Sequence, residues 1–179
     1  MDLLLRLKNI LVALIACFAG NAFSQSHCAT DETEYFSCQI IKSFKVTSLC
    51  GNAQNSELKT NGWLQYRFGI IGKPELTYPS SKSSSSEKFE LNYFHPRGEN
   101  HEVIDVRFLN GNTLYSIELV RTSSHIAGGI NVMTGEKRVS LNCDGEVNKL
   151  YWSQLLSLPE NPNTDKADFL SEFYKNNAK

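Results

Sequence analysis

The sequence predicts an all-β domain, an antiparallel β-barrel or sandwich of about eight or nine strands followed by one or two short C-terminal helices. Three observations support this prediction. Short segments alternate apolar and polar residues along most of the chain, which is typical of half-buried strands. Turn-forming pairs such as Asn110-Gly111 and Thr134-Gly135 separate these segments. A helical period of about 3.6 residues is found only near the C-terminus.

The alternation defines each strand by the apolar residues that share one face. Tyr66 and Phe68 lie on one face of their segment, and Ile117 and Leu119 lie on one face of another. The nine predicted strands cover residues 35–41, 44–50, 63–69, 75–78, 88–94, 104–108, 113–121, 128–133 and 137–143.

The remaining segments are predicted to be a loop and two helices. Ser80 to Ser86 is a serine-rich stretch, and we expect it to form a mobile loop that buries nothing. Residues 150–156 place apolar residues at a period of about 3.6 residues, so a helix is expected there before Pro159. Thr164 is a suitable N-cap for a second helix, and both helices are expected to cover an edge or an open end of the sheet.

Residues 1–24 read as a secretory signal peptide. Arg6 and Lys8 precede an apolar stretch that is too short to span a membrane comfortably, and cleavage is expected after Ser24. The alternative is a lipoprotein, because the residues up to Cys17 resemble a lipobox whose cysteine carries the lipid. Residues 25–179 are then a single β-rich domain, expected to be periplasmic or secreted.

Composition excludes several classes of protein. The chain has 179 residues, with 18 Lys and Arg against 19 Asp and Glu, so its net charge is −1. A nucleic-acid binder needs a surplus of basic residues on one face, and no such cluster is found. With 41% hydrophobic residues, the chain is also too apolar for a disordered protein.

Cysteine usage predicts two disulfides. The mature chain contains Cys28, Cys38, Cys50 and Cys143, an even number in an exported protein. Of the three possible connectivities, a hairpin turning near Lys42 favours Cys38 with Cys50, which leaves Cys28 for Cys143. A zinc site is the alternative, but no C-x2-C pair is present.

Four motifs resemble those of an uncharacterised family of small exported proteins of Gram-negative bacteria. They are Tyr35-Phe36-Ser37-Cys38, Ser48-Leu49-Cys50, Tyr66-Arg67-Phe68-Gly69 and Gly72-Lys73-Pro74-Glu75-Leu76. This resemblance covers residues 35–79 best, and it implies export and a β fold without implying an activity. In size, export and cysteine-tied architecture, the chain is also similar to periplasmic lysozyme inhibitors, which is a likeness of fold alone.

A candidate binding surface lies on the strand around Arg67. Tyr66 and Phe68 are predicted to face the core, so Trp63, Gln65 and Arg67 share the outer face. An aromatic residue beside an arginine is typical of a binding hot spot. The alternative is ordinary cation-π or aliphatic packing on a sheet surface.

The histidines give weaker candidates. His95, Arg97 and His101 flank or occupy a turn and are assigned to a binding loop, whereas a metal site formed by the two histidines with Asp105 is the alternative. Ser124 and His125 are adjacent, and neighbours on a strand point to opposite faces. No catalytic residue, metal ligand or cofactor is therefore predicted.

The favoured function is recognition of another protein in the cell envelope, as an inhibitor or immunity factor against an enzyme such as a cell-wall hydrolase. The loops 80–86 and 95–101 would make the contact. A small-molecule or envelope-component binder is the second hypothesis, and an enzyme of unknown class is the third. The residues that would line a ligand site in the second case are Tyr66, Phe68, Tyr93 and Tyr115.

Overall fold

The computed structural model describes residues 26–52, 62–83, 85–94, 101–122 and 124–145, together with positions 147, 155 and 158. The predicted leader with Cys17, the loop residues His95 and Arg97, and the two C-terminal helices apart from Leu155 lie outside the described residues. Within the described part, no helix is long and apolar enough to cross a bilayer.

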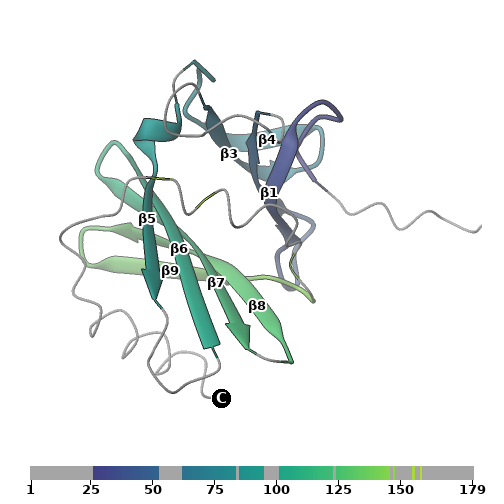
Figure 1. Ribbon diagram of the computed structural model, residues 1–179, viewed down its shortest axis with the longest axis vertical. Coiled ribbons are helices and arrows are strands. Elements are labelled where there is room, and N and C mark those ends of the chain that lie inside the picture. The colour runs from purple at the N-terminus through teal and green to yellow at the C-terminus, as the bar shows by residue number, and fades with distance from the viewer. Residues whose placement is uncertain are drawn as a thin grey trace, which may run out of the picture.

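Two antiparallel sheets face each other in a sandwich-like arrangement (Figure 1). The four-stranded sheet has the order β1-β2-β3-β4, and the five-stranded sheet has the order β5-β6-β7-β8-β9. A single short 3-10 turn, η1 at Ser86–Lys88, precedes β5. The strands are β1 (Thr33–Gln39), β2 (Val46–Gly51), β3 (Leu64–Ile70), β4 (Lys73–Tyr78), β5 (Glu90–Phe94), β6 (His101–Asn110), β7 (Thr113–Thr122), β8 (Ile126–Thr134) and β9 (Lys137–Asn142).

The predicted all-β class and the nine strands are confirmed. Sequential strands pair in each sheet, so hairpins connect them and the fold is a pair of meanders. Asn110 pairs with Thr113, which leaves Gly111 at the first position of the turn, where its φ is +63°. Glycine adopts this left-handed conformation without the steric cost that a side chain brings.

The two sheets are joined at one corner, next to the ends of β1 and β9. Ile40 and Cys143 form an isolated antiparallel bridge. The Ile41 amide donates to the Asn142 carbonyl at 2.9 Å, and the Asp144 amide donates to the Gln39 carbonyl at 2.8 Å. Backbone hydrogen bonds between the residues after β1 and the residues after β9 therefore link the two sheets.

The two disulfides are confirmed in number, but the predicted connectivity is wrong. Cys28 bonds Cys50, and Cys38 bonds Cys143, with Cα–Cα distances of 5.4 and 5.5 Å. In the β1-β2 hairpin Cys38 lies opposite Thr47, whereas Cys50 lies opposite Glu34. Cys38 belongs to the core between the sheets, and Cys50 lies on the outer face beside Arg67. Residues on opposite faces of a hairpin cannot bridge.

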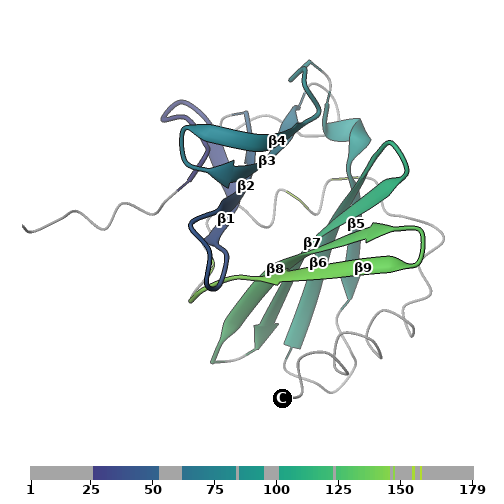
Figure 2. The same cartoon turned by 180° about the vertical axis from the view of Figure 1, so that it is seen from behind.

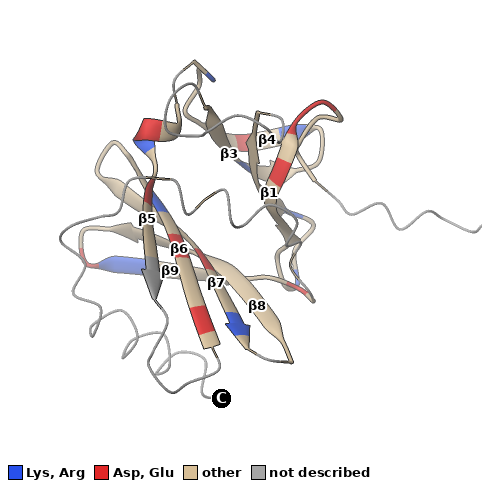
Figure 3. Ribbon diagram, in the orientation of Figure 1, with Lys and Arg blue, Asp and Glu red and all other residues tan. Residues whose placement is uncertain are grey.

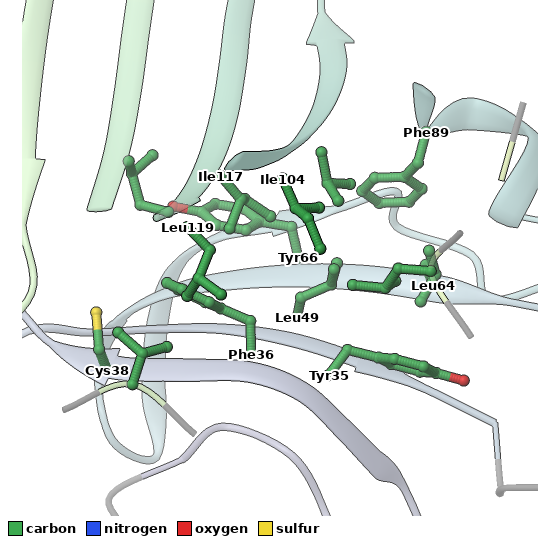
Figure 4. Packing of buried hydrophobic residues seen from close by; sticks show 14 of the residues in the cluster. Tyr35, Phe36, Cys38, Leu49, Leu64, Tyr66, Phe89, Ile104, Ile117 and Leu119 are labelled. Atoms are coloured by element: carbon green, nitrogen blue, oxygen red, sulfur yellow. The ribbon is translucent and has the colours of Figure 1, made fainter. Parts of the chain in front are cut away.

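The core lies between the two sheets and draws on both (Figure 4). Tyr35, Phe36 and Leu49 point into it from the four-stranded sheet, and Ile104 and Ile117 point into it from the other. Burying each such side chain stabilises the fold by about 1.5–3 kcal/mol. From the C-terminal segment, three described residues join the same core: Val147, Leu155 and Leu158.

Gly128 on β8 faces the core and is packed closely by its neighbours. A Cβ at this position would come within 2.8 Å of Val147 Cγ2 and 3.2 Å of Phe36 Cε2. No register shift interrupts the pairing of β7 with β8, so the glycines there do not form a bulge. Val147 and Phe36, which belongs to the facing sheet, therefore leave little room for a side chain at position 128.

Candidate functional site

The residues of the predicted binding surface on β3 lie on the predicted face of the strand, but two of them are much less exposed than expected. Gln65 and Arg67 lie on the outer face of β3, away from Tyr66. Gln65 is nevertheless only 4% exposed, and the Arg67 side chain only 12%. The segment at 26–32 covers them, since it supplies both His27 and Glu32 to Arg67. The prediction of an open surface at Gln65 and Arg67 is therefore wrong.

Arg67 is held by a complete set of acceptors. Its Nη1 and Nη2 donate to the two carboxylate oxygens of Glu32 at 2.6 and 2.7 Å. Nη1 also donates to the His27 carbonyl at 2.6 Å, and Nε donates to Gln65 Oε1 at 2.9 Å. A bidentate arginine-carboxylate pair of this kind fixes geometry as well as charge.

Glu32 is the centre of this cluster. Its side chain is 3% exposed and also accepts hydrogen bonds from Lys82 Nζ at 2.6 Å and from the Ala29 amide at 2.9 Å. Burial by itself would raise the pKa of Glu32, but the hydrogen bonds from Arg67, Lys82 and Ala29 outweigh it and lower the pKa to about 2. The cluster therefore fastens the N-terminal segment to β3, and its charged groups are already satisfied.

The serine-rich loop is also ordered where the structure describes it. Ser85 and Ser86 are buried. Ser85 Oγ donates to the Leu64 carbonyl at 2.7 Å and accepts from the Leu64 amide at 3.1 Å. Lys82 Nζ lies 4.5 Å from the centroid of the Trp63 ring, which makes a cation-π contact with this half-buried residue. The prediction that the stretch buries nothing is wrong, because Ser85 binds the backbone at the start of β3.

The three histidines that the structure describes, His27, His101 and His125, do not converge. His101 is buried at the start of β6, four residues before Asp105 on the same face. Four residues of strand span about 13 Å, which is too far for His101 and Asp105 to share one metal ion. His125 is exposed, and its amide and that of Ser124 both donate to Thr122 Oγ1. His27 Nε2 lies 3.1 Å from the Gly69 carbonyl oxygen.

Two of the aromatic residues considered as a ligand site, Tyr66 and Tyr115, pack against each other and against Phe108. Phe108 stacks on Tyr115 with ring centroids 4.8 Å apart, and on Tyr78 at 4.5 Å. Tyr66 is 1% exposed and lies 5.1 Å from Phe108, measured between ring centroids. These rings occupy the space between the sheets that a ligand would need, which counts against the second hypothesis. The side chain of Tyr93 lies outside the described residues.

A buried carboxylate pair on the outer face of the five-stranded sheet was not predicted. Asp105 and Glu118 lie opposite each other on β6 and β7, and both are buried. Ser116 Oγ donates to Asp105 and lies 3.2 Å from Glu118 Oε1, while Asn92 and Arg107 also bind Asp105. From sequence the two acids alternate with apolar residues, which is equally the pattern of an exposed strand face.

Both carboxyl groups are harder to ionise than usual. Burial raises the pKa of Asp105, and the opposing effects of Arg107, Ser116 and Asn92 do not cancel it. Burial, and then the charge of Asp105, raise the pKa of Glu118 to about 7. The pair therefore holds a proton near neutral pH, as like-charged neighbours in a poorly solvated position do.

Two exposed apolar surfaces lie at opposite sides of the molecule (Figures 1 and 2). The first, called the turn surface here, is formed by the β1-β2 and β3-β4 turns. The second, called the sheet-end row, crosses β6 to β9 beside their turns. The turn surface consists of Ile41, Phe44, Ile70 and Ile71 with Lys42, Lys45 and Lys73, and the sheet-end row consists of Leu109, Leu114, Met133 and Arg138. In the row Leu109 is exposed, whereas Leu114 and Met133 are half-buried.

The chain matches no family model, no curated protein and no solved structure.

Proposed function

We propose that this chain is an exported binding protein that recognises another protein through the sheet-end row. The observation that carries this proposal is the continuity of the row across four strands. Leu109 pairs with Leu114, Leu114 pairs with Met133, and Met133 pairs with Arg138. Leu109 is 59% exposed, although it is a large apolar residue in a regular strand.

The composition of the row suits a protein interface. Methionine and arginine are enriched at the cores of protein interfaces, where they adapt their shape to a partner. A polar rim borders the row, because Asn110, Asn112 and Glu136 are exposed at the β6-β7 and β8-β9 turns beside it. An apolar centre with a polar rim is the usual arrangement of such a surface.

The scaffold holds this row in a fixed shape. The next two rows of the same face contain Ser116, Asp105 and Glu118, which are buried and hydrogen-bonded to one another. The row is therefore supported by regular strands on one side and ends in short turns on the other. A preorganised surface loses little conformational entropy when it binds.

Export and the class of partner belong to the same proposal. Two disulfides favour an oxidising compartment over the cytoplasm. We expect cleavage of the leader after Ser24 and a periplasmic location, so that the partner is a protein of the cell envelope. An enzyme that the chain would inhibit or neutralise, such as a cell-wall hydrolase, is the partner class we expect.

Site-specific photo-crosslinking tests this proposal in living cells. A photoreactive residue at Leu109 is expected to give one discrete adduct with another protein. The same residue at Ser124, which is exposed on the opposite end of the same sheet, is the matched control and is expected to give none. Absence of an adduct from position 109, or equal adducts from both positions, would refute the proposal.

A further inference from the structure

We infer that the turn surface docks onto a bilayer that contains anionic phospholipids. This second surface lies on the side of the molecule away from the sheet-end row, so it is free while the row binds a protein (Figures 1 and 2). The inference does not depend on the proposed function, because it concerns different residues and a different class of partner.

Four large apolar side chains are exposed on the two turns or directly next to them. Phe44 is 86% exposed, and Ile41, Ile70 and Ile71 are 44%, 51% and 43% exposed. The turns are neighbours, because Val46 at the start of β2 pairs with Gly69 near the end of β3. Lys45 connects them further, since its ammonium lies 5.4 Å from the Phe68 ring centroid and 2.7 Å from Glu75 on β4.

Basic residues accompany these apolar side chains. Lys42 and Lys73 are exposed, and Lys45 is partly exposed. Figure 3 shows blue segments of Lys and Arg on this side of the four-stranded sheet. Among the described residues, Lys45 and Glu75 neutralise each other, so Lys42 and Lys73 outnumber Asp144, the other exposed acid beside the turn. Lysines whose stems lie along apolar residues place their ammonium groups at the level of lipid phosphates while the apolar tips enter the acyl boundary.

Lys42 adopts a backbone conformation that costs stability. Its φ is +57°, in the left-handed region where glycine is preferred over a residue with a side chain. A glycine at this position would relieve that cost but would remove the charge. The strained conformation therefore points to a role of the lysine side chain outside the fold.

The shape of the surface favours a bilayer over a second protein. Ile41, Phe44 and Ile71 lie on two narrow turns and Ile70 is the last residue of β3, so these side chains offer protruding tips with little continuous flat area. Protein interfaces need an extended complementary face, whereas a bilayer surface accepts protruding apolar tips individually.

Vesicle co-sedimentation of the exported protein tests the inference. Cys17→Ser protein is used, so that no acyl chain contributes. Vesicles of phosphatidylethanolamine with phosphatidylglycerol are expected to sediment the protein at low salt, and vesicles of phosphatidylcholine alone are expected to sediment much less. Phe44→Ser is expected to weaken binding about tenfold or more. Lys42→Gly is expected to weaken it about fivefold, while the fold becomes no less stable.

The matched control is Leu109→Ser, an exposed apolar position on the opposite side, which is expected to leave vesicle binding unchanged. A Phe44→Trp variant adds an independent readout, because its fluorescence emission is expected to shift to shorter wavelength on anionic vesicles. Failure of the wild-type protein to bind anionic vesicles would overturn the inference. Equal binding by Phe44→Ser, or equal loss in Leu109→Ser, would overturn it as well.

Discussion

The dependence of stability on pH follows from two buried glutamates that are perturbed in opposite directions. Glu118 has a folded-state pKa of about 7 instead of 4.5, so unfolding releases a proton at neutral pH and stability falls as the pH rises from about 4.5 to above 7. Glu32 has a folded-state pKa of about 2, so its contribution is present above pH 4.5 and is lost as the pH falls toward 2. We therefore expect maximal stability near about pH 5.

The magnitude on the alkaline side follows from the shift at Glu118. One pKa unit corresponds to about 1.4 kcal/mol. The raised pKa of Glu118 therefore lowers the free energy of unfolding by about 2 to 3 kcal/mol between about pH 5 and pH 8. Asp105 is perturbed in the same direction, which reinforces the sign of the effect. Glu118→Gln cannot ionise, so this variant is expected to lose most of the decline.

Urea unfolding of the oxidised protein at about pH 5 and pH 8 measures this effect directly. The wild-type free energy of unfolding is expected to be lower at the higher pH by about 2 kcal/mol, and Glu118→Gln is expected to show a much smaller difference. Equal wild-type stability at the two pH values would refute the reasoning. An unchanged decline in Glu118→Gln would assign the effect to another group.

Three further predictions concern the features that hold the fold together. Replacing the Cys38–Cys143 pair by serines is expected to cost about 5 kcal/mol and replacing the Cys28–Cys50 pair about 3 kcal/mol, because the first closes the longer loop; urea unfolding measures both, and the reverse order would contradict this account. Arg67→Ala is expected to cost about 3–5 kcal/mol in the same assay, because it leaves a buried carboxylate without its main partner, whereas a loss below about 1 kcal/mol would show that the cluster is dispensable. Gly128→Ala is expected to lower the free energy of unfolding by about 1–3 kcal/mol, because its Cβ would meet the facing sheet, and an unchanged unfolding midpoint would contradict the packing.

The strands were predictable from sequence because each has one face in a core and one face outside it. Alternation located all nine strands in the right order, including the hairpin of β6 and β7. The strand ends were less predictable. Ile41 and Phe44 were assigned to strands, whereas β1 ends at Gln39 and β2 begins at Val46, so both residues lie on an exposed turn. An apolar residue on a turn has no periodic signal that separates it from the adjacent strand.

The connectivity of the cysteines could have been predicted better from the same hairpin. A turn centred between Lys42 and Ser43 places Cys38 opposite Thr47, and Cys50 lies three residues further along β2. The partner of Cys28 could not be inferred in this way. It depends on how the chain at 26–32 lies across β3, which is a contact between distant segments.

The polar clusters were missed for a related reason. Arg67 and Asp105 each occupy the outer positions of a strand, where alternation predicts solvent. Asp105 is buried and the Arg67 side chain is largely covered, and the residues that satisfy Arg67 come from segments 35 and 40 positions away. The alternation of residues along a strand predicts which face a side chain lies on. Whether the outer face is buried depends on segments elsewhere in the chain that pack over it.

Native mass spectrometry of the complex isolated from cell envelopes tests the central claim most directly. The wild-type chain and the Phe44→Ser variant are both predicted to appear with one partner protein in a discrete complex, because the sheet-end row is intact in each. Leu109→Asp, which places a charge in the centre of the row, is predicted to appear alone while keeping its two disulfides. A wild-type chain that never carries a partner, or a complex that persists in Leu109→Asp, would contradict the account.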